Sequence, residues 1–146
     1  MNIRKKIGIL LSGLLIFTLV NIGTTFAHTA EKDNLQVIHP WVEAAQKGDN
    51  TIVHPTFMNN DEGRSYTIIR AESNVSESVK FKSAGKLIGR IEIKPEDVLS
   101  DEDVILELHV LKQDLVEGQV INLTLFFKDK SQLSFKIGVG ASTMPE

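Results

Sequence analysis

Apolar and polar residues alternate with a period of two along much of the chain, a pattern that is typical of half-buried β-strands. The clearest run spans residues 104–110. Because successive side chains of a strand point to opposite faces, this run predicts one inward and one outward set. The inward set is Val104, Leu106, Leu108 and Val110, and the outward set is Ile105, Glu107 and His109.

Two more runs, 120–127 and 133–139, alternate in the same way and predict a hairpin across residues 128–131. Their apolar stripes are Ile121, Leu123, Leu125 and Phe127 in the first run and Leu133, Phe135, Ile137 and Val139 in the second. A short helical turn is predicted from Pro95. Weaker strands are predicted at 35–38, 51–58, 66–72, 75–82 and 90–93. This spacing predicts an all-β protein with two packed antiparallel sheets, an Ig-like Greek-key β-sandwich.

The N-terminal residues have the features of an export signal. Three basic residues precede an apolar stretch at 7–22, which is short and interrupted for a membrane span, and small residues follow at Thr25 and Ala27. We expect a signal peptide at 1–27, cleaved after Ala27, with an uncleaved N-terminal anchor as the alternative. The mature protein would be periplasmic or otherwise extracytoplasmic, without stable membrane insertion.

The rest of the chain is expected to form a polar lead-in at 28–34, one β-sandwich domain at 35–140 and a loose tail at 141–146. The 146 residues include no cysteine, which excludes disulfides, thiolate chemistry and Cys-ligated metal centres. The formal charge of −3 becomes −6 when the three basic residues of the signal are removed. An acidic protein without a Lys/Arg stripe is not expected to bind nucleic acid.

The sequence has no Gly-rich phosphate loop, nucleophile elbow or zinc-protease motif, so we expect a protein that is not an enzyme. The candidate donor side chains are histidines. Signal cleavage would expose His28 as the new N-terminus, where its amine and imidazole can chelate copper or nickel; the alternative is a frayed terminus with an incidental imidazole. His39 precedes Pro40 and is interpreted as a turn residue, and His54 precedes Pro55 at a predicted strand edge.

Glu107 and His109 lie two residues apart on the outward face of one predicted strand, so both side chains can converge on one ion or ligand. The alternative is an exposed acid and imidazole that only solvate the sheet. Lys80 and Lys82 also point outward from their predicted strand. Because a protonated amine has no lone pair for a metal, these lysines are candidates for contact with a protein partner or for protection of a sheet edge.

The order of residues in the mature chain resembles a known family. Residues 111–127 (LKQDLVEGQVINLTLFF) are similar to the "gLk-x-pL-x-eGd-x-v-x-ltl-x-F" stretch of the periplasmic copper chaperones called PCu(A)C. Residues 38–41 (IHPW) resemble that family's "a-x-W" strand, 56–59 (TFMN) its "t-i-x-N" strand, and 68–82 its "LvgasS…vElH" segment. The resemblance spans 35–139 and implies a cupredoxin-like β-sandwich that carries copper to oxidase assembly.

The same resemblance places the family's first ligand His at Lys82 and its His-x-Met pair at Ile105 and Glu107. The family's Met-containing loop corresponds to residues 83–90, which hold no Met. Cu(I) favours thioether and imidazole donors, which ammonium, alkyl and carboxylate groups do not supply. The resemblance therefore implies the family scaffold with a changed donor set, and copper is expected as a cofactor through the resemblance alone.

Two functional hypotheses remain. In the first, an exported copper-chaperone-like protein has relocated its metal ligands to His28, or to Glu107 and His109, and delivers the ion to a copper-accepting extracytoplasmic protein. In the second, the same fold is an interaction module without metal. It would bind a protein partner through the former copper-site face, where Lys80 and Lys82 lie beside Glu107 and His109.

Overall fold

The computed structural model describes residues 29–140, and every helix or strand assigned in this range is a β-strand, as the sequence predicted. The expected signal peptide at 1–27, His28 and the expected tail at 141–146 lie outside the described residues and stay predictions. Within 29–140 no helix is long and apolar enough to cross a membrane.

Thirteen strands follow one another along the described chain. They are β1 (Thr29–Lys32), β2 (Leu35–Ile38), β3 (Trp41–Glu43), β4 (Thr51–His54), β5 (Phe57–Asn59), β6 (Tyr66–Ser73), β7 (Ser76–Ser83), β8 (Lys86–Ile88), β9 (Ile91–Ile93), β10 (Val98–Leu99), β11 (Ile105–Leu111), β12 (Val120–Phe127) and β13 (Gln132–Gly140).

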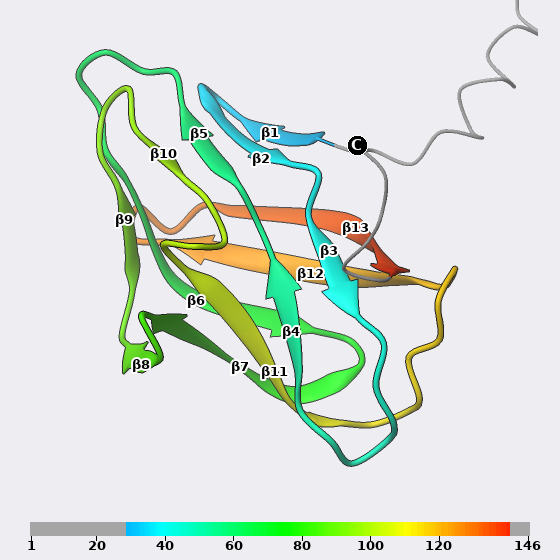
Figure 1. Cartoon of the computed structure of the whole chain (residues 1–146). Coiled ribbons are helices and arrows are strands. Elements are labelled where there is room, and N and C mark those ends of the chain that lie inside the picture. The colour runs from blue at the N-terminus through cyan, green and yellow to red at the C-terminus, as the bar shows by residue number, and fades with distance from the viewer. Residues whose placement is uncertain (1–28, 141–146) are drawn as a thin grey trace, which may run out of the picture.

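The strands form two sheets that enclose the core (Figure 1). The smaller sheet has the order β1-β2-β5-β10, and the nine-stranded sheet has the order β8-β7-β11-β4-β3-β13-β12-β6-β9. The predicted hairpin is present as β12 and β13. The expectation of purely antiparallel sheets fails at one pair, β3 and β13, which run parallel. These two strands lie far apart in the sequence, so no tight turn fixes their relative direction.

Prolines mark two of the corners where the chain passes from one sheet to the other. Pro40 lies between β2 and β3, and Pro55 lies between β4 and β5. Proline has no N–H for a sheet ladder, so each one ends the pairing of the strand before it. His39 forms the first bend with a φ of 45°, as expected of a turn residue. The Ile38 N–H donates to the Thr56 carbonyl at 2.8 Å and ties the two corners together.

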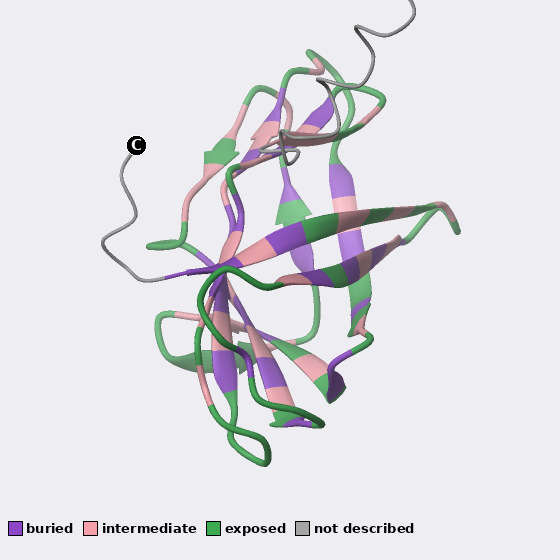
Figure 2. Cartoon of the chain, turned by 90° about the vertical axis from the view of Figure 1, so that its right-hand side faces the viewer, coloured by how far each residue is buried: buried purple, intermediate pink, exposed green. Residues whose placement is uncertain are grey.

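The predicted alternation produces the core (Figure 2). On β11, Leu106 and Leu108 are fully buried, whereas Glu107 and His109 on the other face stay partly exposed. The apolar stripe of β12 is buried along its whole length, and that of β13 is buried or half-buried. The outward face of β11 is therefore a surface on which polar side chains remain accessible.

The inward prediction for Val110 is wrong, because this side chain is 38% exposed and Leu111 occupies the core position instead. Val110 has a φ of 59°, a left-handed conformation that takes its side chain out of the alternation. Its N–H is bound by the Asn50 side-chain oxygen at 2.9 Å. The alternation of inward and outward side chains on β11 therefore breaks directly after His109, although the strand continues to Leu111.

The helical turn predicted from Pro95 is also wrong. Residues 95–96 form a non-helical turn in which Glu96 has a φ of 61°, and β10 follows. Four short strands, β1, β3, β8 and β10, lie outside the ranges in which the alternation predicted strands. One of them, β1, lies inside the segment that was expected as a polar lead-in.

Candidate functional site

The residues predicted for metal and partner binding lie together on the outer face of the nine-stranded sheet. There β7 and β11 pair antiparallel, with Lys82 opposite Ile105 and Lys80 opposite Glu107. His109 follows two residues along β11 on the same face. The structure thus brings four predicted side chains to one corner, and the three positions that the resemblance equates with family ligands adjoin one another there.

Glu107 is the centre of this corner. The Lys82 Nζ lies 3.2 Å from its Oε1, and the His109 Nε2 lies 2.6 Å from the same oxygen. Partial burial alone raises the pKa of Glu107, but the hydrogen bonds from Lys82 and His109 outweigh it and hold the pKa below the ordinary 4.5. Glu107 is therefore an ionised carboxylate shared between an ammonium and an imidazole.

This arrangement limits the chemistry of the corner. Ile105 supplies no donor atom for a metal. The Lys82 ammonium is paired with both oxygens of the Glu107 carboxylate, which a metal ion would need as a ligand. Lys80 lies opposite Glu107 with an exposed side chain. One imidazole and one ion-paired carboxylate can accept a cation only if Lys82 moves away, whereas the corner can contact a charged protein surface as it stands.

A second polar cluster, which the sequence did not predict, lies on the same outer face where β3 meets β4. The His54 ring stacks on the Trp41 ring, with centroids 4.4 Å apart and planes inclined by 13°. The His54 Nε2 lies 2.6 Å from the Glu43 Oε2, and its Nδ1 lies 3.0 Å from the Asp101 Oδ2. Register places His54 beside Ile105, because Val53 pairs with Leu106 one residue further along. This cluster therefore neighbours the first one across β11.

Local sequence explains why this second cluster forms. Trp41 and Glu43 alternate with the buried Val42, so both point outward from β3. Pairing of Trp41 with His54 then places an aromatic ring, a carboxylate and an imidazole together. The only signals in the sequence were His54 at a strand end and the W-x-E alternation. Neither reveals that the two segments are neighbours, nor that the loop after β10 delivers Asp101.

Among residues 29–140, no three His, Asp or Glu side chains surround a common point that could hold a metal ion. In the His54 cluster the two carboxylates contact different ring nitrogens, which face away from each other. A single ion could therefore use only one nitrogen and one of the two carboxylates.

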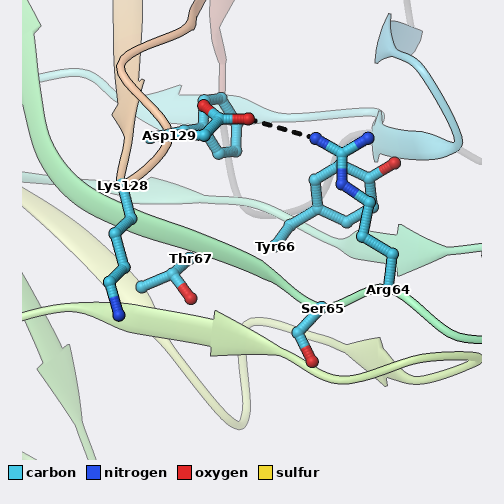
Figure 3. Close-up of a pocket in the computed structure, with 7 residues that line it drawn as sticks. Arg64, Ser65, Tyr66, Thr67, Lys128 and Asp129 are labelled. Carbon is cyan, nitrogen blue, oxygen red and sulfur yellow. Dashed lines mark hydrogen bonds and ion pairs between the residues drawn. The ribbon is translucent and has the colours of Figure 1, made fainter.

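A shallow pocket of about 390 Å³ lies elsewhere on the molecule (Figure 3). The Arg64 guanidinium covers the Tyr66 ring at 4.7 Å from its centroid and contacts Asp129 at 3.1 Å and Asp33 at 3.4 Å. These cations and carboxylates satisfy one another within the protein. None of the residues predicted for metal or partner binding lines this pocket.

The remaining predicted ligand, His28, lies outside the described residues. Its neighbour Thr29 pairs with Ile38 in the smaller sheet, whereas Glu107 and His109 belong to the larger one. A chelate at the processed N-terminus is therefore a prediction separate from the Glu107/His109 pair.

No family model matches the sequence, and no curated protein matches it. Solved structures do share its fold. The copper-bound PCuAC domain from PmoF2 has a TM-score of 0.69 at 20% identity, over 78% of this chain and 98% of that domain. The apo PCuAC domain from PmoF1 has a TM-score of 0.70 at 19% identity, over 78% of this chain and 99% of that one. The solution structure of CuI-DR1885 from Deinococcus radiodurans has a TM-score of 0.60 at 19% identity, over 73% of this chain and 80% of that one. Residues 29–140 therefore adopt the fold of PCuAC domains, the β-sandwich that the sequence resemblance implied.

Proposed function

We propose that this chain is an exported copper-handling protein that binds a copper ion on the outer face of its larger sheet and passes it to a protein partner. One observation carries the proposal. In a fold shared with the copper-bound domain from PmoF2 and with CuI-DR1885, the polar residues predicted from the sequence meet at one accessible corner. Movement of Lys82 away from Glu107 would free the carboxylate and the imidazole for an ion, and return of Lys82 would release the ion again.

The donor types favour copper(II) over copper(I). Glu107 and His109 offer one carboxylate oxygen and one imidazole nitrogen, and no thioether or thiolate accompanies them. Nitrogen and oxygen donors suit Cu(II), whereas Cu(I) is selected by sulfur ligands. His28, at a terminus freed by signal cleavage, would supply a further nitrogen pair of the same kind.

A second candidate function is an interaction module without metal. One observation favours it: Lys82 already neutralises Glu107, and Lys80 remains exposed beside the pair. Such an ion-paired corner can orient a charged protein partner without any ion. In the copper-handling protein, the same lysines would face the copper-accepting protein.

The test is a copper(II) titration of the protein purified after its natural export, with the N-terminus read by mass spectrometry. We expect binding that survives competition with a moderate chelator. His109→Gln should lower the affinity about tenfold or more, since it removes one of two protein donors, and His28→Ala should remove any terminal chelate. Binding that is absent in the parent protein would contradict copper handling and favour the interaction module. A mature chain that begins before residue 7 would contradict export by cleavage.

A further inference from the structure

We propose that His54 and Glu43 form a distinct copper(II) position on the outer sheet face, with Asp101 orienting the imidazole. The assignment rests on the proposed function only for the identity of the metal. The pair of donors itself follows from geometry: the sequence offered His54 as a histidine at a strand edge without assigning it to a site, and it did not indicate Glu43.

The first argument is the spacing of the donors. The His54 Nε2 and the Glu43 Oε2 lie 2.6 Å apart. Two metal ligands at ordinary bond lengths and a right angle lie roughly 3 Å apart, so the pair needs to open by only a few tenths of an ångström. The Glu43 side chain is 43% exposed and can make this adjustment, whereas the His54 ring is held against Trp41.

The second argument is the partner of the other ring nitrogen. Metal-binding histidines usually donate their second N–H to a carboxylate, which fixes the tautomer and the direction of the ring. Asp101 supplies this carboxylate, with its Oδ2 at 3.0 Å from the His54 Nδ1. The 2.6 Å contact between Nε2 and Glu43 requires a proton between these two atoms. A copper(II) ion bound at Nε2 would displace this proton to the solvent, while the proton on Nδ1 stays bound to Asp101. For His109, the structure gives a contact at Nε2 only.

The third argument is charge. Among the described residues, Glu43 and Asp101 pair with the His54 ring and with no lysine or arginine. Two carboxylates around one imidazole attract a cation, whereas the Glu107 carboxylate is neutralised by Lys82. The first-row order of affinities then favours Cu(II) over Zn(II) for a nitrogen and oxygen site.

The position is open on one side. Glu43 and Asp101 are 43% and 44% exposed, and two protein donors leave coordination places for water or for a partner's ligand. An ion held in this way can be exchanged, which is what transfer to another protein requires.

Trp41 provides the readout, because it is the single tryptophan of the chain and it stacks on His54. Copper(II) bound at the ring should quench its fluorescence. We would titrate CuCl₂ into the parent protein and into four variants: His54→Gln, Glu43→Gln, His109→Gln and the control Glu102→Gln, whose exposed side chain belongs to neither histidine pair. Glu43→Gln keeps the ring and its stacking partner, so it tests the site even if His54→Gln perturbs the fold.

We expect quenching that saturates in the parent protein and in the control Glu102→Gln, and that needs at least tenfold more copper in Glu43→Gln and His54→Gln. If His109→Gln abolishes copper binding while Glu43→Gln and His54→Gln behave like the parent protein, the site at His54 is refuted and the proposed function stands. If the parent protein binds no copper, both are refuted. Reversal of the quenching by equimolar ZnCl₂ would refute the copper assignment.

Discussion

The outer sheet face carries two histidine–carboxylate pairs with the same donor spacing and opposite electrostatic settings. In each, an imidazole Nε2 lies 2.6 Å from a glutamate oxygen. At His109 an ammonium completes the group, so one carboxylate faces one lysine; at His54 a second carboxylate completes it, so two carboxylates face one imidazole and no lysine. The comparison shows that the third residue, rather than the pair, decides whether a cation or a protein surface is the better partner.

The two pairs also differ in how their strands are anchored. His54 ends β4 at a proline corner, and a stacked Trp41 holds its ring. Glu107 and His109 flank Leu108, which is fully buried, but the strand leaves its alternation immediately afterwards at Val110. The position of the second pair therefore depends on Leu108 more than on any residue that follows it.

The largest effect is expected from Leu108→Ala, which should lower the free energy of unfolding by about 2–5 kcal/mol because it leaves a cavity between the sheets. Chemical denaturation followed by circular dichroism measures it. Val110→Ala is the matched control on the same strand. Its side chain is 38% exposed, so a change within about 0.5 kcal/mol is expected. Equal losses of unfolding free energy in both variants would contradict this expectation and would show that packing of Val110 anchors the strand as strongly as packing of Leu108 does.

Leu108 and Val110 also show what the sequence could and could not predict about the fold. Alternation identified the long strands and the inward side chains of β11 and β12, because burial of one face imposes a period of two. It failed at Val110, where the Asn50 side chain binds the backbone N–H and the chain adopts a left-handed conformation. Hydrogen bonds from a distant loop leave no periodic signal.

The candidate sites divide in the same way. Glu107 and His109 could be paired from the sequence, since two residues on one face of one strand must be neighbours. His54 and Glu43 could not, because their contact depends on the pairing of β3 with β4, and Asp101 arrives from a loop 47 residues further along. The alternation along one strand predicts which of its side chains are neighbours. Contacts between side chains of different strands can be predicted only when the pairing register of those strands is known.

The next largest effect is expected from Asp101→Ala. Loss of the carboxylate on Nδ1 frees the ring and its tautomer, so copper(II) affinity at His54 should fall roughly 10- to 100-fold. Titration of Trp41 fluorescence measures the change. Glu102→Ala removes the same charge from the adjacent exposed residue, where the structure gives the side chain no hydrogen bond, and should leave the affinity within about twofold. Similar losses of copper(II) affinity in both variants would show that Asp101 acts only through its negative charge and does not orient the His54 ring.

A gain of function should separate the two pairs further. Lys82→Gln removes the ammonium from Glu107. The corner at His109 then has a carboxylate without a lysine partner, as the one at His54 does. We expect copper(II) affinity there to rise by up to about tenfold, since the carboxylate no longer has a competing ion pair. Lys80→Gln makes the same charge change on an exposed side chain and should raise the affinity less. Calorimetry in the Glu43→Gln background isolates the His109 site, and an unchanged affinity would show that Lys82 does not compete with the metal.

The smallest effect concerns the charged region around Arg64, which is separate from both pairs. The pKa of Asp129 lies below its ordinary 3.8, chiefly because the Ser131 hydroxyl and backbone N–H donate hydrogen bonds to it. A carboxyl whose pKa is lower in the folded state stabilises the protein above its unfolded pKa, and this stabilisation is lost as the pH falls through the folded value. Ser131→Ala should therefore lower the melting temperature slightly at pH 6 and reduce the further loss on acidification below about pH 4. Copper(II) quenching of Trp41 at pH 6 should be the same in this variant as in the parent protein. A shift in the quenching curve would mean that the structure around Asp129 is coupled to the His54 cluster, so that the residues beside each imidazole are not the sole cause of the difference between the two pairs.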